Sequence, residues 1–301
     1  MNKVSAQDRT AISVPDDIGQ SRSGQSRSDQ SHSLANRPLA PTTRPMGAVN
    51  WVGLWTLCRK EVARFLVVYN QTLAAPLVTT LLFLAIFTLA LGRGHTMIGD
   101  IPFDVFLAPG LIMMSMIQNS FANTSSSIVS SKMQGNIVDV LMAPLSPFEL
   151  TVGYAFGGLV RGLLVGMTVA IAMMIFVHVS VAHVGVVVFY ALSSSLMLSL
   201  LGVMGGVWAQ KHEQMSVVSN FIITPCAFLS GTFYSIDRLP GMWNYAAHVN
   251  PFFYMIDGFR YGFIGHAEGS LAIGVAVMIV GNLALGATCL WMFASGYRIK
   301  A

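Results

Sequence analysis

The stretch Leu73–Leu91, with the sequence LAAPLVTTLLFLAIFTLAL, decides the class of fold. Its 19 residues include no charged side chain. A helix rises about 1.5 Å per residue, so this length covers roughly 28 Å, which is close to the hydrocarbon thickness of a bilayer. The stretch therefore predicts a helix that spans a membrane.

Five further apolar runs of similar length follow along the chain. They are about Val105–Ile128, Leu159–Val177, Val184–Ala209, Met215–Ile236 and Leu271–Ser295. The composition agrees, because 54% of the 301 residues are hydrophobic and only 10% are charged, whereas a soluble domain has roughly 25% charged residues. We expect an all-α membrane protein with six transmembrane helices.

The charges between these runs predict the orientation. Cytoplasmic loops of membrane proteins carry an excess of Lys and Arg. With both termini inside, the outer segments hold three basic residues, Arg93, Arg238 and Arg260. The inner segments hold eight even without the first 48 residues: Arg59, Lys60, Arg64, Lys132, Arg161, Lys211, Arg298 and Lys300. This bias favours an N-in, C-in topology.

Residues 1–48 have the composition of a disordered segment. They are rich in Ser, Gln, Arg, Asp and Pro, so they cannot bury enough apolar surface to offset the entropy of ordering. Residues 19–26 have the glycine spacing of a phosphate-binding loop, but Gln25 occupies the lysine position and no strand precedes it. We expect a disordered cytosolic tail without a nucleotide site.

Residues 49–70 have the pattern of an amphipathic interfacial helix. Aromatic and aliphatic residues are interleaved with the polar set Arg59, Lys60, Glu61 and Arg64. Aromatic rings favour the headgroup level, and basic side chains favour anionic lipid on the cytoplasmic side. We expect this helix to contact membrane lipid ahead of a transmembrane domain at residues 66–298.

Residues 132–149, KMQGNIVDVLMAPLSPFE, are too polar to span a bilayer and too long for a simple turn. An apolar stripe at helical spacing predicts one surface helix that ends before Pro144. The stripe consists of Met133, Ile137, Val140 and Leu141. A capping box is expected to open the next helix, because Ser146 precedes a proline and stands three residues before Glu149.

Two interpretations of residues 132–149 remain. The segment lies on the membrane without a partner, or it is a cytosolic docking surface for another polypeptide. Its basic residues are too few for a polybasic lipid patch, so docking of a protein is favoured.

The second run, Val105–Ile128, is unusually polar in its cytosolic half. Its hydrogen-bonding side chains include Gln118, Asn119 and Asn123, followed by a series of hydroxyl residues. Such groups join helices in lipid. The alternative is that they line a polar translocation path, and the sequence leaves both interpretations open.

Arg161 is the one charge within the third run. A buried arginine in a membrane marks a substrate site by default. Because the helix is expected to begin near Pro147, its first turns would lie at the headgroups, and we expect Arg161 to snorkel to the cytosolic surface. His178 and His183 flank the following short loop and are interpreted as interface residues.

The external link between the last two runs, residues 237–270, is too apolar for a free loop. The segments Leu239–Trp243 and Pro251–Tyr261 are expected to form two short helices that re-enter the outer leaflet, where protein or a wet cavity must cover them. Asp257 and Arg260 lie about one turn apart, and a local pair that steadies the second helix is favoured over a substrate contact.

The sequence has no catalytic or metal-binding constellation. The runs carry no buried acid, and Cys58, Cys226 and Cys289 lack metal-ligand spacing. Ion-coupled carriers usually keep buried ionisable groups, so the energy source is expected in another chain. A secondary transporter or channel that runs without ATP remains the alternative, and a non-transporting assembly protein is a third.

From about Trp51 to its C-terminus the chain resembles the membrane subunits of bacterial ABC-2 type exporters. The residues that carry the resemblance occur in the same order as in that family. They are Arg59-Lys-Glu61 with Arg64 before the first span, then Gly135, Asp139, Pro144 and Ser146, then Ser230-Gly231-Thr-Phe-Tyr234 with Leu239-Pro240, and finally Asn250-Pro251-Phe-Phe-Tyr254 with Asp257 and Arg260.

The resemblance implies a multi-pass permease of the bacterial inner membrane that exports an amphipathic substrate. Two permease copies, most simply a homodimer, would form the path, and two separately encoded ATP-binding subunits would dock below. The coupling residues would be Lys132, Gly135, Asp139, Pro144, Ser146 and Glu149, and the external re-entrant residues Asn250, Pro251, Tyr254, Asp257 and Arg260. The permease itself would bind no cofactor, no metal and no nucleic acid.

Overall fold

The computed structural model describes residues 49–90, 97–98, 101–177, 179–236 and 240–298. The tail predicted at residues 1–48 lies outside these ranges, as do the loop positions Arg93, His178, Arg238 and Lys300 and the first residue of the expected external helix, Leu239.

The described chain is predominantly helical, with one pair of very short strands. In order, the elements are α2 (Trp51–Leu66), α3 (Tyr69–Ala90), β1 (Met97–Ile98), β2 (Ile101–Pro102), α4 (Phe103–Met133), α5 (Ile137–Met142), α6 (Pro147–Phe176), α7 (Val184–Trp208), α8 (His212–Val218), η1 (Ser219–Ile223), α9 (Thr224–Leu229), α10 (Gly241–Val249), α11 (Pro251–Ile264) and α12 (Leu271–Ser295).

Five of the described helices are long and apolar enough to cross a membrane, namely α3, α4, α6, α7 and α12. Each coincides with one of the predicted runs, and α12 has the predicted bounds. Two helices extend well beyond their apolar runs, because α4 continues to Met133 and α6 begins at Pro147. These extra turns carry the polar residues that sequence hydropathy could not assign to a span.

The run predicted at Met215–Ile236 forms a shorter and less regular helix. Helical backbone extends from α8 through the π-helical turn η1 into α9, with right-handed helical dihedrals at both junctions. It ends at Leu229 instead of Ile236, because Gly231 follows with a φ of +73°, a conformation that glycine adopts without steric cost. The predicted end of this run is therefore wrong.

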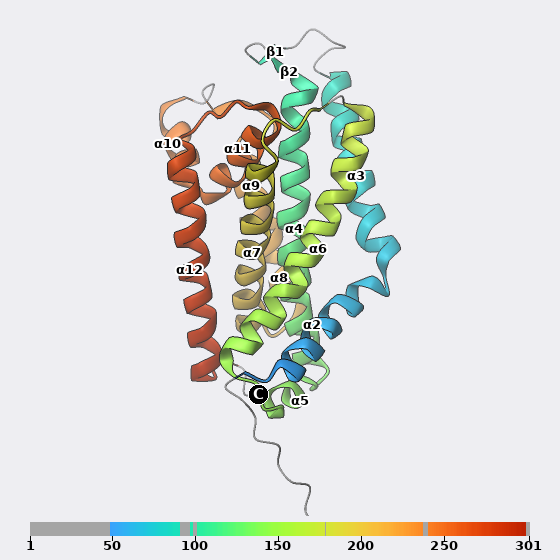
Figure 1. The fold of residues 1–301 in the computed structure, drawn as a ribbon, viewed down its shortest axis with the longest axis vertical. Helices are drawn as coiled ribbons and strands as arrows, with labels where there is room; N and C mark the ends of the chain where they lie inside the picture. Colours follow the sequence, from blue (N-terminus) through green and yellow to red (C-terminus); the bar gives the residue numbers. More distant parts are fainter. Residues whose placement is uncertain (1–48, 91–96, 99–100, 178, 237–239, 299–301) are drawn as a thin grey trace, which may run out of the picture. The chain divides into compact units, whose positions relative to one another are not determined.

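The centre of the fold is α4. In its most apolar window 78% of the residues are buried inside the protein, against 17% for both α3 and α12. It packs most extensively on α7 and α6, and it also contacts α3 and α11. In Figure 1, α4 runs between α6 and α7, while α3 and α12 lie on opposite sides of the bundle. The least apolar of the five helices is thus the most buried one, while α3 and α12 leave apolar residues exposed on the outside of the bundle.

Small residues allow α4 and α7 to approach closely. A Cβ added at Gly202 would lie 2.7 Å from the carbonyl oxygen of Phe121, and one at Gly206 would lie 2.9 Å from Cβ of Ile128. Both distances are shorter than van der Waals contact, so glycine is required where these helices cross.

The segment 132–149 does not form the single surface helix that its apolar stripe predicted. α4 continues through Met133, Gly135 has a φ of +76°, and α5 is a separate turn-and-a-half at Ile137–Met142. Glycine ends helices readily in this left-handed conformation. Ile137 is buried, while Met133 and Leu141 are exposed, so the stripe is divided between two helices.

The predicted corner before α6 is confirmed. The backbone N–H of Glu149 donates to Ser146 Oγ at 3.3 Å, and the Ser146 N–H donates back to Glu149 Oε2 at 2.6 Å. Pro147 occupies the first turn. This reciprocal pair is the capping box that the sequence indicated.

Two short helices follow α9, as expected, although both are longer than predicted. α10 covers Gly241–Val249, and α11 continues to Ile264, where Gly265 ends it with a φ of +76°. α11 packs against α7, α4 and α12 and buries most of its residues. At the same end of the bundle lies the β1–β2 pair (Figure 1), whose two-residue strands are too short to give a hydrophobic pattern in sequence.

Candidate functional site

A cavity of about 510 Å³ opens between α3, α4 and α6. Its described polar lining is Gln71, Thr72, Thr79, Thr80, Ser115, Gln118, Asn119 and Arg161. Its described apolar lining is Val68, Ala75, Pro76, Phe83, Leu111 and Met114. Gln118 and Asn119, which the sequence put forward as path residues, therefore line a cavity whose walls carry both polar and apolar side chains.

Arg161 lies on the wall of this cavity. Its Nη2 donates to Asn119 Oδ1 at 3.2 Å, and Asn119 Nδ2 donates to the carbonyl of Ser115 at 3.0 Å. Arg161 stands about 21 Å along α6 from Pro147, in the middle of the helix. Its side chain contacts α4, while the expectation that it snorkels to the cytosolic surface stays a prediction.

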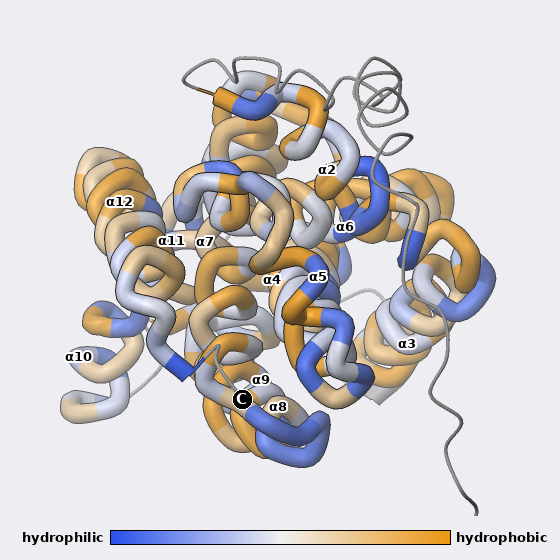
Figure 2. Tube along the Cα trace, turned by 90° about the horizontal axis from the view of Figure 1, so that it is seen from below, coloured by the Kyte–Doolittle hydropathy of each residue, from blue (hydrophilic) through white to orange (hydrophobic). Residues whose placement is uncertain are grey.

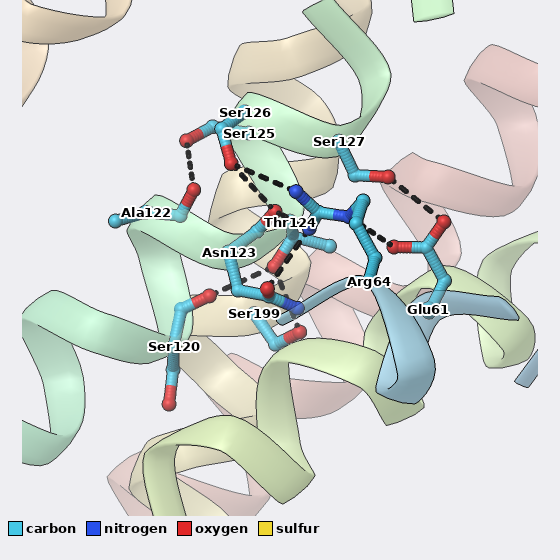
Figure 3. A network of polar contacts seen from close by, with 10 residues as sticks. All are labelled: Glu61, Arg64, Ser120, Ala122, Asn123, Thr124, Ser125, Ser126, Ser127 and Ser199. Carbon is cyan, nitrogen blue, oxygen red and sulfur yellow. Dashed lines mark hydrogen bonds and ion pairs between the residues drawn. The ribbon is translucent and has the colours of Figure 1, made fainter. Parts of the chain in front are cut away.

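Asn123, the third path candidate, is buried in a different place, against α2. Arg64 Nη2 donates to its carbonyl oxygen at 2.7 Å and to its Oδ1 at 2.8 Å. Figure 3 shows Arg64 extending toward Asn123 and Ser126 of α4. Asn123 therefore joins two helices, and it is not among the described residues that line the cavity.

Glu61 completes the contact between α2 and α4. It is 0% exposed, it accepts a hydrogen bond from Ser127 Oγ at 2.8 Å, and its Oε2 lies 3.6 Å from Nε of Arg64. The sequence grouped Glu61 with Arg59 and Lys60 on a polar face. Arg59 and Lys60 are exposed, but Glu61 and Arg64 turn toward α4, so the polar residues of α2 have two separate roles.

A second hydrogen-bonded contact joins the core helices. Thr124 Oγ1 lies 3.0 Å from Ser199 Oγ of α7, and Ser199 Oγ donates to the carbonyl of Ala155 in α6 at 2.7 Å. Sequence reasoning missed Ser199, because a serine in an apolar run gives no sign of its partner. The polar half of α4 thus contributes partly to helix packing and partly to the cavity.

At the cytosolic end predicted from charge, the corner before α6 is tied to the start of α2. The backbone N–H of Asn50 donates to Glu149 Oε1, and Asn50 Nδ2 donates to the carbonyl of Pro144 at 3.2 Å. Glu149 is buried by these contacts. Glu149, one of the predicted coupling residues, therefore holds the corner in place and is not itself exposed for docking.

Lys132 is also engaged within the chain. Its Nζ donates to the carbonyl oxygens of Val207 and Ala209, the second at 3.1 Å, where α7 ends. A cation is favourable at a helix C-terminus because it satisfies carbonyls that lack partners in the helix. The remaining predicted coupling residues are exposed, namely Gly135, Asp139, Pro144 and Ser146.

Apolar side chains are exposed around α5. Met142 is 79% exposed and Val138 is 50% exposed; Leu141 of α5, Met133 at the end of α4 and Phe148 in the first turn of α6 are exposed as well. Figure 2 views the bundle from the end that carries α5, where α5 mixes hydrophilic and hydrophobic colouring. We name these five residues together with Asp139 the α5 surface. Exposed apolar groups gathered on a polar end are typical of a protein interaction site.

At the opposite end, Asp257 and Arg260 contact different partners, so the predicted local pair is wrong. Arg260 is fully buried, its Nη2 donates to the carbonyl of Gly231 at 2.6 Å, and its guanidinium lies 3.7 Å from the centre of the Phe106 ring. Asp257 accepts from the backbone N–H groups of Glu268 and Gly269 at 2.9 Å each. Both residues hold loops against α11.

Asn250 connects α11 to the end of α9. Its Nδ2 donates to the carbonyl of Cys226 and to Ser230 Oγ, both at 2.8 Å, and its Oδ1 caps the N–H of Phe252. Pro251 takes the first helical position and Tyr254 is half-buried. The ring of His183 stacks on that of Tyr261 at 5.1 Å. These contacts give the predicted external residues structural roles.

In the part of the chain that the structure describes, no group of three His, Cys, Asp or Glu side chains is placed to hold a metal ion. The cavity and the α5 surface are therefore the two features to compare with known proteins.

The sequence profile described as ABC-2 type transporter matches residues 52–264. The chain belongs to the ABC-2 type transporter family. It is 36% identical over 254 residues to inner membrane transport permease YadH of Escherichia coli strain K12, covering 83% of this chain and 98% of that protein. More distant relatives include nodulation protein J of Rhizobium leguminosarum bv. viciae, 26% identical over 254 residues, covering 79% of this chain and 91% of that protein.

The chain is thus a membrane permease subunit of an ABC transporter, as its resemblance implied, and a multi-pass protein of the bacterial inner membrane. The matched region begins within α2 and ends with α11, so it includes the cavity, the α5 surface and the external helices.

Proposed function

We propose that this permease exports an amphipathic substrate and that a separate ATP-binding subunit drives it by docking on the α5 surface. The observation that carries the proposal is the construction of that surface. Exposed apolar residues and Asp139 lie on a short helix that is connected directly to α4 and α6, two of the three helices that wall the cavity.

The proposed topology has six spans with both termini in the cytosol. The five long helices and the broken helix α8–η1–α9 would be these spans, with α10 and α11 as re-entrant external helices. Two observations support it: α5 and the end of α12 lie at the same end of the bundle (Figure 1), and the basic residues of the loops concentrate at that end.

The proposed domain order is an interfacial helix at residues 49–70 followed by the transmembrane domain at residues 66–298. Trp51 and Trp55 are exposed on α2, as are Arg59 and Lys60. Tryptophan at the headgroup level and basic side chains near anionic lipid would hold α2 on the membrane surface.

The proposed assembly contains two permease copies, most simply a homodimer, and two ATP-binding subunits. The permease would bind no ATP of its own and act as no enzyme. Its α3 and α12 leave most of their apolar surface exposed, which lipid and a second permease copy can cover.

Coupling requires that the docked ATP-binding subunit contact the α5 surface differently in its two states, because a contact of equal free energy in both states shifts nothing. Movement of α5 would be transmitted to α4 through the short link at Gly135 and to α6 through the capped corner at Ser146. The cavity between these helices would then open or close as α5 moves.

The test uses the permease expressed with the ATP-binding subunit of its own operon. Asp139→Lys and Val138→Asp are expected to lower permease-stimulated ATP hydrolysis by about tenfold, since each places a new charge in an apolar contact worth at least about 1.4 kcal/mol. Gln210→Lys, an exposed change on the same end outside the α5 surface, is the control. Full stimulation in both α5 variants, with normal amounts in the membrane, would contradict docking at α5.

The alternative, a transporter driven without ATP, predicts a different result. Purified permease alone in vesicles would then move substrate under an ion gradient, and adding the ATP-binding subunit with ATP would not change the rate.

A further inference from the structure

The cavity between α3, α4 and α6 has a charged side chain, Arg161, on its wall. Arg161 is the only ionisable residue among the described residues that line it. The amide of Asn119 takes one guanidinium N–H, while Arg161 Nε is buried and has no partner among the described residues. An arginine held in this way is incompletely satisfied.

A positive charge away from water is costly unless a group of opposite charge or a set of acceptors compensates it. The neutral carbonyl of Asn119 compensates only part of that cost. The guanidinium is a planar donor that matches the oxygen geometry of phosphate and carboxylate groups. The Arg161 Nη N–H groups that no described residue accepts therefore favour a ligand that brings its own acid group.

The uncharged residues of the lining indicate the chemistry of the rest of the ligand, beyond its acidic group. The amide of Gln118 and the hydroxyl of Thr79 lie on the lining with Arg161, and Phe83, Leu111 and Met114 are among its apolar lining residues. α3, which contributes much of this wall, is only 17% buried in its apolar window. A ligand with a charged head and an apolar chain would find a partner for each part on this lining.

We propose that this cavity binds an amphiphilic anion, with its phosphate or other acidic group on Arg161 and its apolar chain along α3 and α4. Binding is a property of the permease itself. The further statement that this anion belongs to the class of exported substrates rests on the proposed transport function.

The binding test uses the permease with its ATP-binding subunit in nanodiscs of zwitterionic lipid, titrated with radiolabelled dodecyl phosphate. Binding is expected to saturate, and neither inorganic phosphate nor dodecyl maltoside should displace the probe. Arg161→Gln is expected to weaken binding at least about tenfold, the equivalent of one charge-assisted hydrogen bond, and Arg161→Lys should retain most of it. Lys211→Gln, which removes an exposed positive charge outside the cavity, is the matched control.

Displacement by dodecyl maltoside as readily as by unlabelled dodecyl phosphate would overturn the proposal in the unmodified protein, even if Arg161→Gln failed to fold. Equal binding by Arg161→Gln and the wild type would overturn it as well. Release of the probe on addition of ATP would identify the anion as cargo, and retention through ATP hydrolysis would identify it as a resident lipid on the same site. Failure of the ATP-binding subunit to co-purify would count against the proposed function, while the binding of the probe could still be measured.

Discussion

At the scale of single residues, the contact between α2 and α4 depends on a buried carboxylate and an arginine. Glu61 accepts from Ser127 and faces Arg64, and Arg64 in turn donates to both oxygens of Asn123 (Figure 3). Each group compensates the burial of the other. Removing one partner should therefore cost more than neutralising the pair.

Arg64→Met is expected to destabilise the permease by about 3 kcal/mol, because it leaves Glu61 buried without a cation. Glu61→Gln should cost less, since the amide still accepts from Ser127 and Arg64 keeps Asn123. The double substitution should be less harmful than Arg64→Met alone. Thermal midpoints of the three detergent-solubilised variants test this order, and a double variant less stable than either single variant would contradict the pairing.

Packing of α4 on α7 gives a second prediction from single residues. Gly206→Ala places a Cβ 2.9 Å from Ile128 Cβ and 3.1 Å from the carbonyl of Ser125, so overpacking of about 1–3 kcal/mol is expected. Gly185→Ala is the matched control in the same helix, because a Cβ at Gly185 meets nothing within 4 Å. Scanning fluorimetry should show a lower midpoint for Gly206→Ala only; equal midpoints would mean that the helices are not in close contact.

At the scale of elements, the sequence predicted the long helices well. A single uncharged run of bilayer length satisfies its backbone hydrogen bonds in lipid only as a helix. The capping box at Ser146 was also predicted from the sequence, since its two residues lie only three positions apart. The break at Gly135 was missed because the apolar spacing of Met133 and Ile137 continues across it. Hydropathy reports which face is apolar, and it does not report where the backbone turns.

The candidate site was harder to predict from the sequence, because its contacts join helices that are far apart along the chain. Gln118 and Asn119 were identified as polar residues in an apolar run, but whether each one packs or lines a cavity depends on neighbouring helices. For Arg161 the sequence predicted a position near the headgroups but gave no sign of its partner on α4. Its contact with Asn119 joins positions 42 residues apart, which no local pattern encodes.

Gly135→Ala tests the break between α4 and α5. Gly135 has a φ of +76° and open space around its Cα, so alanine adds no clash but disfavours the left-handed conformation by about 1 kcal/mol. We expect α4 and α5 to tend toward one continuous helix and ATP hydrolysis to become less responsive to substrate, with little change in thermal stability. An unchanged response would show that the angle at Gly135 is not part of coupling.

At the scale of the whole molecule, the two ends of the bundle are built differently. One end presents the α5 surface and the basic loops, and the other carries β1–β2, α10 and the buried polar contacts of α11 (Figure 1). Between them, α4 links the cavity to the α5 surface along one continuous helix. This arrangement suits a permease that receives force at one end and admits substrate in the middle.

Site-specific photocrosslinking in native membranes tests the central claim most directly. A crosslinking amino acid is placed at Val138 on the α5 surface or at Trp243 on α10, two exposed positions at opposite ends of the bundle. We predict that Val138 captures an ATP-binding subunit and that Trp243 does not. Capture at Trp243, or a fully expressed permease that captures no ATP-binding subunit at Val138, would contradict the account.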